Sequence, residues 1–191
     1  MKQSGMLELP VLGLLKEREM HGYELRKRLT MMLGPFWQVS WGSLYPTLRR
    51  LARAGAVEKV QDASSRAGSL VSTRRRNVYR ITDKGERLFA RLLEETSGPI
   101  DVEHFTIRLP FFRYLDREVR VEILERRRAY LQERLAEFKE SVRAAGKQDT
   151  YTESLQNHEV ETTESDIAWI DELLTRERGS ELGPRTKASK A

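Results

Sequence analysis

Residues 39–60 read VSWGSLYPTLRRLARAGAVEKV, and this stretch decides the fold. Its apolar residues recur at spacings of four and three, which predicts an amphipathic helix whose apolar stripe consists of Leu44, Leu48, Leu51 and Ala52. Gly55 is suited to end that helix. Pro46 leaves two starts open. With Ser40 as the N-cap the proline falls near the sixth helical position, and with Ser43 as the N-cap it falls in the tolerant first turn.

Two more helices are expected before this stretch. Residues 6–16 are dense in apolar side chains and predict a buried helix that starts near residue 8, because Pro10 is tolerated in a first turn. Residues 20–33 read MHGYELRKRLTMML, where apolar side chains recur every three or four residues with basic residues between them. We expect a second amphipathic helix there, ended by Gly34 and Pro35.

The order of elements after the third helix is typical of a winged helix-turn-helix. Short strands are predicted at residues 56–60 and 77–81, joined by a long polar loop at residues 61–76. Thr82 and Asp83 are expected to cap a fourth helix that runs to Gly98, with Asp83 and Glu86 spaced as a capping box. In this architecture the third helix enters the DNA major groove and the strand pair forms a wing beside it.

The chain changes character after residue 99. An apolar clump at residues 100–115 precedes two long helices, expected at 116–145 and 152–178. Their apolar residues step by three, four and seven, as in coiled coils, and we predict dimerisation through Leu124, Leu131, Leu135, Phe138, Val160, Ile167, Ile170 and Leu174. An intramolecular helical hairpin is the alternative, but a hairpin alone has little to bury both seams against.

These patterns predict a mostly α protein with a small β-hairpin wing. We expect a winged helix-turn-helix DNA-binding domain at residues 1–99, a helical dimerisation domain at residues 100–178 and a disordered tail at residues 179–191.

Composition supports a basic DNA-binding half. The 191 residues carry a net charge of +5, made of +8 in residues 1–99, −5 in residues 100–178 and +2 in the tail. A basic half is suited to a polyanion such as nucleic acid. The absence of cysteine excludes disulfides, thiolate catalysis and cysteine-ligated metals. No apolar run is long enough to cross a membrane, and we expect a cytoplasmic protein without a signal peptide or a membrane partner.

The third helix carries the candidate DNA contacts. At 100° per residue Trp41, Tyr45 and Arg49 form one ridge, a pattern suited to phosphates and base edges. The other candidates lie beside that ridge or at the N-terminus of the helix, and they are Ser40, Gly42, Ser43, Pro46 and Arg50. Trp41 and Tyr45 have a second interpretation, in which their rings pack against a neighbouring helix.

Four arginines of the wing loop form a further basic group. We expect Arg66, Arg74, Arg75 and Arg76 to contact phosphates or the minor groove. A solvated charge run is the alternative.

Three motifs together resemble the PadR family of bacterial transcriptional regulators. They are HGYEL at residues 21–25, GSLYPTLRRL at residues 42–51 and NVYRITDKG at residues 77–85. The length of the C-terminal part is similar to the subfamily with the larger C-terminal domain. The resemblance implies a homodimer that binds a palindromic operator on double-stranded DNA, usually as a repressor. It also implies release by a small-molecule effector, such as the phenolic acids and planar drugs bound by some relatives. The long wing loop with four arginines departs from the family pattern.

Other functions have weaker support. The chain lacks a Walker loop, a GxSxG elbow, an HExxH motif and a Rossmann glycine pattern, so we expect no enzyme and no cofactor. His21, His104 and His158 have no metal-site spacing. The remaining alternatives are a transcriptional activator and a winged-helix adaptor for protein partners. Phe111, Phe112 and Trp169 are candidates for an aromatic effector pocket. Core packing is the alternative interpretation of these three residues.

Overall fold

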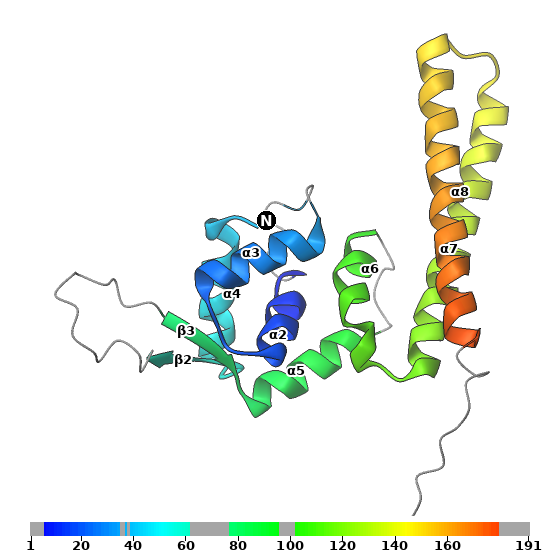
Figure 1. The fold of residues 1–191 in the computed structure, drawn as a ribbon. Coiled ribbons are helices and arrows are strands. Elements are labelled where there is room, and N and C mark those ends of the chain that lie inside the picture. The colour runs from blue at the N-terminus through cyan, green and yellow to red at the C-terminus, as the bar shows by residue number, and fades with distance from the viewer. Residues whose placement is uncertain (1–5, 35–36, 38, 62–76, 96–101, 180–191) are drawn as a thin grey trace, which may run out of the picture. The chain divides into compact units, whose positions relative to one another are not determined.

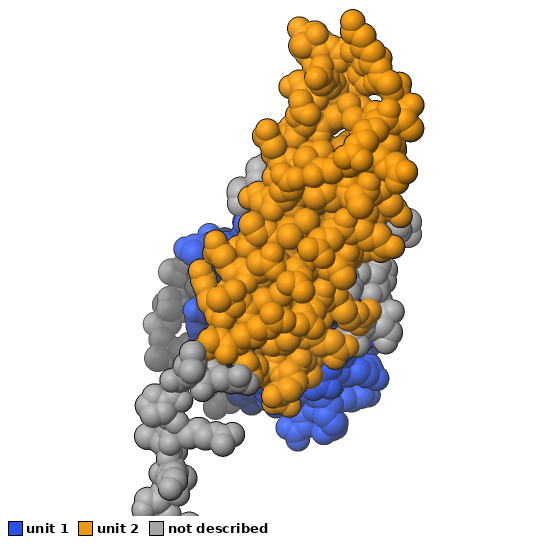
Figure 2. All heavy atoms as spheres, turned by 90° about the vertical axis from the view of Figure 1, so that its right-hand side faces the viewer, with its two compact units in different colours: residues 1–115 blue, residues 116–191 orange. Residues whose placement is uncertain are grey.

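The computed structural model describes residues 6–34, 37, 39–61, 77–95 and 102–179. The chain divides into two compact units, residues 1–115 and residues 116–191 (Figure 2). The first unit has the expected mostly α composition with a small sheet (Figure 1). Its elements are α2 (Glu8–Glu17), β1 (Met20–His21), α3 (Gly22–Leu33), α4 (Trp41–Arg53), β2 (Val57–Gln61), β3 (Asn77–Ile81), α5 (Asp83–Glu94), α6 (Val102–Arg108) and the 3-10 helix η2 (Leu109–Tyr114).

The sheet has three antiparallel strands in the order β1-β3-β2, one more than predicted. Residues 20 and 21 were expected to begin the second helix, but Met20 pairs with Tyr79 and His21 pairs with Val78. The prediction was wrong there because two residues are too few for a strand period, and their partners lie far along the chain. Helix α3 therefore begins at Gly22.

Helix α4 begins directly after Ser40, the first of the two N-caps that the sequence left open. The Ser40 hydroxyl accepts a hydrogen bond from the Ser43 backbone N–H at 3.1 Å, so Ser40 is the N-cap. Pro46 consequently lies inside the helix, where it gives up one backbone hydrogen bond. The predicted stripe is confirmed for Leu44, Leu48 and Leu51, which are buried, whereas Ala52 at its end is only half-buried. Burial of that stripe outweighs the loss at the proline.

Helix α5 is capped by Thr82, one of the two residues predicted to cap it. The Thr82 hydroxyl accepts from the Gly85 N–H at 3.1 Å and donates to the Gly55 carbonyl at 2.7 Å. Thr82 is therefore the N-cap, and the predicted Asp83–Glu86 box is wrong by one position. Glu86 pairs instead with Lys16 of α2 at 3.0 Å. The helix ends at Glu94, before the predicted Gly98, which lies outside the described residues.

Residues 102–115 belong to the first unit, although we expected a boundary after residue 99. The physical reason is aromatic packing. Phe111 is fully buried, contacts the Phe89 ring edge-on at 5.7 Å, and lies so close to Gly13 of α2 that a Cβ there would be 2.2 Å from its ring. The apolar clump that follows Pro99 is thus part of the N-terminal core.

The second unit is an antiparallel pair of long helices, α7 (Arg117–Ala145) and α8 (Thr150–Gly179). Helix α7 ends at Ala145, where its end was predicted, and Gly146 with a φ of +70° begins the short connection. Two ion pairs confirm that the helices run antiparallel. Arg120 near the start of α7 binds Glu177 near the end of α8 at 2.8 Å, and Lys139 further along α7 binds Glu164 earlier in α8 at 2.6 Å. Within the described ranges no helix combines the length and apolar content that a membrane crossing requires.

Candidate nucleic-acid interface

The ridge predicted on α4 is present and exposed. Trp41 is 36% exposed and Tyr45 is 42% exposed, and their rings stack with centroids 5.2 Å apart and planes 20° apart. Arg49, one turn further along, is exposed as well. Stacking holds two flat aromatic surfaces side by side, which restricts the side-chain freedom that binding would otherwise cost.

Helix α3 fixes the tryptophan in place. The guanidinium carbon of Arg26 lies 5.0 Å from the centre of the Trp41 ring, a cation–π contact. The same side chain is anchored because its Nε donates a hydrogen bond to the Val39 carbonyl at 2.8 Å. Trp41 thus packs against Arg26 of α3 and stacks on Tyr45 while staying partly exposed, so packing against a neighbouring helix is confirmed and contact with DNA stays a prediction.

The two neighbouring arginines of α4 have different surroundings. The Arg50 Nε lies 2.5 Å from the Glu8 carboxylate of α2, so an internal ion pair compensates its charge. In the described part of the chain, Arg49 and Arg53 have no ion pair. We therefore retain Arg49 as a candidate DNA contact and regard Arg50 mainly as a link between α4 and α2.

The remaining candidates on α4 lie at or near its N-terminus. Gly42 and Pro46 are exposed, and a Cβ built on Gly42 meets only the Ser40 hydroxyl, at 3.6 Å. The Ser43 hydroxyl donates to the Ser40 carbonyl at 3.0 Å. The two serines thus order the start of the helix, and the open glycine leaves room for close approach of a phosphate.

Only the base of the wing can be described. The strands pair from Val57 with Ile81 to Gln61 with Asn77, as a hairpin requires. The four wing arginines, Arg66, Arg74, Arg75 and Arg76, lie outside the described residues.

Sequence reasoning missed Tyr79, which was considered only as a strand residue. It is 3% exposed, and burial together with the nearby Tyr45 raises the pKa of its phenol, while Arg49 acts to lower it. Tyr79 therefore stays protonated at neutral pH and is a hydrogen-bond donor at the foot of the α4 ridge. The signal for it is weak, because a tyrosine in a strand is ordinary.

The raised pKa of Tyr79 predicts a loss of stability in alkali. Below about pH 10 the phenol is neutral in both folded and unfolded chains, and its contribution is fully present. At higher pH the unfolded chain releases a proton that the folded chain retains, so the free energy of unfolding falls until the folded pKa is passed. Urea unfolding between pH 9 and pH 11.5 should show a steeper decline for the wild type than for Tyr79→Phe. Parallel declines would contradict the assignment.

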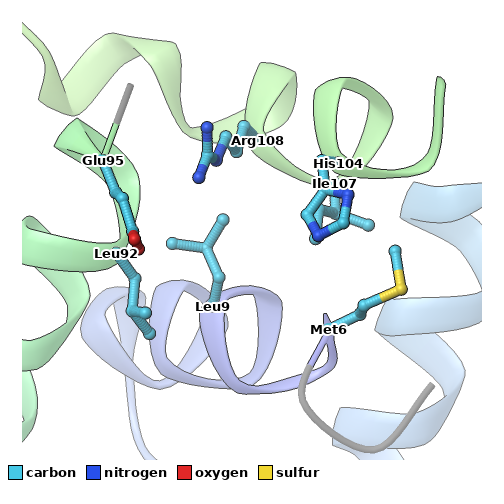
Figure 3. A pocket seen from close by; sticks show the side chains of 7 residues that line it. All are labelled: Met6, Leu9, Leu92, Glu95, His104, Ile107 and Arg108. Atoms are coloured by element: carbon cyan, nitrogen blue, oxygen red, sulfur yellow. The ribbon is translucent and has the colours of Figure 1, made fainter. Parts of the chain in front are cut away.

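A pocket of about 280 Å³ lies in the first unit between α2, α5 and α6 (Figure 3). Apolar side chains form much of its lining, and two basic side chains and one carboxylate add polarity. The lining residues are Met6, Leu9, Leu92, Glu95, His104, Ile107 and Arg108. This combination suits a small amphiphilic ligand.

The predicted aromatic effector residues lie elsewhere. Phe111 and Phe112 are buried core residues of the first unit, so the core interpretation holds for them. Trp169 lies on α8 of the second unit and is 44% exposed.

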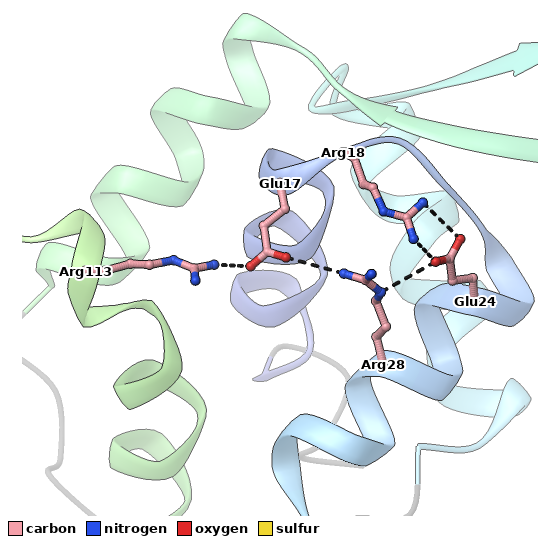
Figure 4. A network of polar contacts seen from close by, with 5 residues as sticks. All are labelled: Glu17, Arg18, Glu24, Arg28 and Arg113. Carbon is pink, nitrogen blue, oxygen red and sulfur yellow. Dashed lines mark hydrogen bonds and ion pairs between the residues drawn. The ribbon is translucent and has the colours of Figure 1, made fainter.

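A network of ion pairs joins three elements of the first unit, α2, α3 and η2 (Figure 4). Glu17 at the end of α2 binds Arg113 of η2 and, at 3.5 Å, Arg28 of α3. Arg28 also lies 3.5 Å from Glu24, which binds Arg18. Each exposed pair alone stabilises the fold little, but the network ties η2 to the helix-turn-helix.

The predicted dimerisation residues fall into two groups in the single chain. Leu124, Leu131, Ile170 and Leu174 are buried where α7 and α8 pack together. The other four are only half-buried, namely Leu135, Phe138, Val160 and Ile167.

The chain is similar in sequence to known transcriptional regulators. Residues 11–91 match a family model described as the transcriptional regulator PadR-like family, and residues 103–176 match one described as virulence activator alpha C-term. The negative transcriptional regulator PadR of Bacillus subtilis is 22% identical over 180 residues, which cover 88% of this chain and 96% of that protein.

The chain is also similar to solved structures of Bacillus subtilis PadR. The complex with operator DNA is 20% identical, covers 90% of this chain and 98% of its own, and has a TM-score of 0.42. The complex with p-coumaric acid is 18% identical, covers 93% and 98% of the two chains, and has a TM-score of 0.41.

Proposed function

The chain belongs to the PadR-like family of transcriptional regulators, and from this membership we propose that it represses its target genes by binding a palindromic operator as a homodimer. The observation that carries the proposal is the exposed ridge of Trp41, Tyr45 and Arg49. Helix α4 contains three arginines and no acidic residue, so its exposed face offers donors and positive charge to DNA. The matched relatives are regulators rather than enzymes.

The mode of DNA binding follows from the exposed face of α4. The helix enters the major groove, with Arg49 reaching a guanine edge and the N-terminal serines beside the backbone. The wing arginines contact phosphates to either side. In a dimer the two copies of α4 read half-sites about 34–36 Å apart, one helical turn of DNA.

Selection from a randomised duplex library tests this proposal. The purified full chain is expected to enrich an inverted repeat and to hold it against excess scrambled duplex at physiological salt. A control library passed over a Trp41→Ala, Arg49→Gln double variant should yield no such repeat. If the wild type enriches no sequence, the chain is not a sequence-specific regulator.

Activation is the second candidate for the direction of regulation. It is favoured by the match of residues 103–176 to the virulence activator C-terminal model. A reporter gene placed behind the selected duplex distinguishes the two, because a repressor lowers expression and an activator raises it.

The dimer is proposed to form along one line of α8. Leu155, Thr162 and Trp169 are spaced by seven residues and are all exposed, with Leu155 60% exposed. Such a line suits coiled-coil-like contact with a second copy. Leu155→Glu is expected to weaken the dimer by about 100-fold in sedimentation equilibrium, because each copy would bury a carboxylate without a partner. Ser154→Glu, off the line, is the matched control. A dimer of unchanged strength would place the interface elsewhere.

Release by a small molecule is proposed to operate through the pocket of Figure 3. A one-ring aromatic carboxylic acid fits its apolar lining, with the carboxylate at Arg108. With p-coumaric acid as the probe, the wild type should leave its selected duplex, and Arg108→Gln should need at least about 10-fold more acid. Glu95→Gln removes a negative charge from the same pocket and should need less. Equal responses of all three proteins would exclude this pocket.

A further inference from the structure

Three elements meet at the first residue of α3. A Cβ built on Gly22 would lie 3.6 Å from the ring of Tyr79 on β3 and 3.8 Å from the hydroxyl oxygen of Tyr45 on α4. Helix α3 has His21 as its N-cap residue, and no side chain caps it by a hydrogen bond. The first backbone N–H groups of α3, which have no acceptor within the helix, therefore lie next to both phenols.

The Tyr79 hydroxyl lacks an acceptor of its own. The residue is 3% exposed, yet in the part of the chain that the structure describes its hydroxyl makes no hydrogen bond. The hydroxyl oxygen is not among the fully buried polar atoms that lack a partner, so it is accessible from the surface although the rest of the residue is buried. The raised pKa keeps this phenol protonated, so its hydroxyl can donate a hydrogen bond to an acceptor that approaches from outside.

The surroundings carry positive charge. Lys59 lies directly opposite Tyr79 in the β2–β3 ladder, and cross-strand partners present their side chains on the same face. Lys59 and Arg49 are exposed and have no ion pair among the described residues. The nearby carboxylates are already neutralised, since Glu19 binds Arg80 and Glu24 binds Arg18.

We propose that this junction is a seat for one phosphate of the DNA backbone, with the hydroxyls of Tyr45 and Tyr79 and the first N–H groups of α3 as donors. Lys59 supplies the neutralising charge, and Arg49 is left to contact the guanine edge. The proposal rests on the proposed function and assigns Tyr45 to the backbone rather than to a base. A phosphate held here sets the register of α4 in the groove without reading sequence.

Binding of the full-length Tyr79→Phe variant tests the seat. The probes are the duplex selected by the wild type and a scrambled duplex of equal composition, titrated by fluorescence anisotropy at several salt concentrations. The variant should bind both duplexes about 10-fold more weakly, the effect of one hydrogen bond to a charged group. Its salt slope should be unchanged, because no charge is removed, whereas Lys59→Gln should lower the slope by about 1. Tyr151→Phe, an exposed phenol on α8, is the control.

The possible results of these titrations separate the phosphate seat from the proposed function. Wild-type affinity of Tyr79→Phe, in a background where Arg49→Gln still loses affinity, overturns the seat and leaves the proposed function intact. A lowered urea midpoint that accounts for the weaker binding also overturns it, since the hydroxyl is then structural. If selection yields no enriched duplex but Tyr79→Phe weakens binding to the scrambled one, the seat stands and sequence-specific regulation falls. Gly22→Ala, which adds a methyl group beside the Tyr45 hydroxyl, should weaken binding without lowering stability.

Discussion

Gly85→Ala is expected to lower the free energy of unfolding of the first unit by about 3 kcal/mol or more. A Cβ at this position would lie 2.0 Å from the Ala56 carbonyl oxygen and 2.7 Å from Cγ1 of Ile81. The carbonyl has little freedom to move, because it accepts the Thr82 backbone N–H at 3.1 Å. The substitution therefore forces apart the end of β3, the start of β2 and the first turn of α5.

Urea unfolding followed by circular dichroism measures this effect. Gly42→Ala is the matched control, because a Cβ there contacts only the Ser40 hydroxyl and the exchange should stabilise α4 by about 0.5–1 kcal/mol. Equal midpoints for Gly85→Ala and the wild type would mean that α5 does not press on the β2 backbone as described. We also expect Gly85→Ala to lose DNA binding at temperatures where the wild type retains it.

Arg49→Gln is expected to weaken binding to the selected duplex by about 30-fold, within the roughly 1–3 kcal/mol that a bidentate arginine–guanine contact contributes. The scrambled duplex should lose less, since a base contact is absent there. The physical reason is that Arg49 is exposed on the α4 ridge and has no ion pair among the described residues.

Arg50→Gln is the sharpest control, because it removes the same charge one residue further along the same helix. Its guanidinium is bound to Glu8, so its removal should reduce stability slightly and preserve discrimination between the two duplexes. Anisotropy titrations of both variants on both duplexes supply the comparison. If Arg50→Gln loses discrimination and Arg49→Gln keeps it, the orientation of α4 on DNA is the reverse of the one proposed.

Local pattern was sufficient to predict helices α2, α3, α4 and α5 and the exposed ridge, but not α6 and η2. The spacing of Leu44, Leu48 and Leu51 determines which face of α4 is buried, and the position of Trp41 and Tyr45 on another face follows from the helical period. These features depend on neighbours within a few residues, which a single sequence displays directly.

The features that sequence reasoning missed depend on partners far along the chain. Strand β1 exists because Met20 pairs with Tyr79, and Arg50 is neutralised by Glu8, 42 residues earlier. Residues 102–115 join the N-terminal core because the Phe111 ring fits against Gly13. No periodicity records such contacts, since each depends on how complete elements pack.

The ion-pair network of Figure 4 affects how salt titrations of this protein should be interpreted. Salt that displaces the chain from DNA also screens the bonds of Glu17 to Arg28 and Arg113. Part of the measured salt slope then reports loosening inside the protein rather than counterions released from DNA. A count of phosphate contacts taken from that slope will be too high, unless the slope is also measured in a Glu17→Gln variant, where this internal contribution is largely removed.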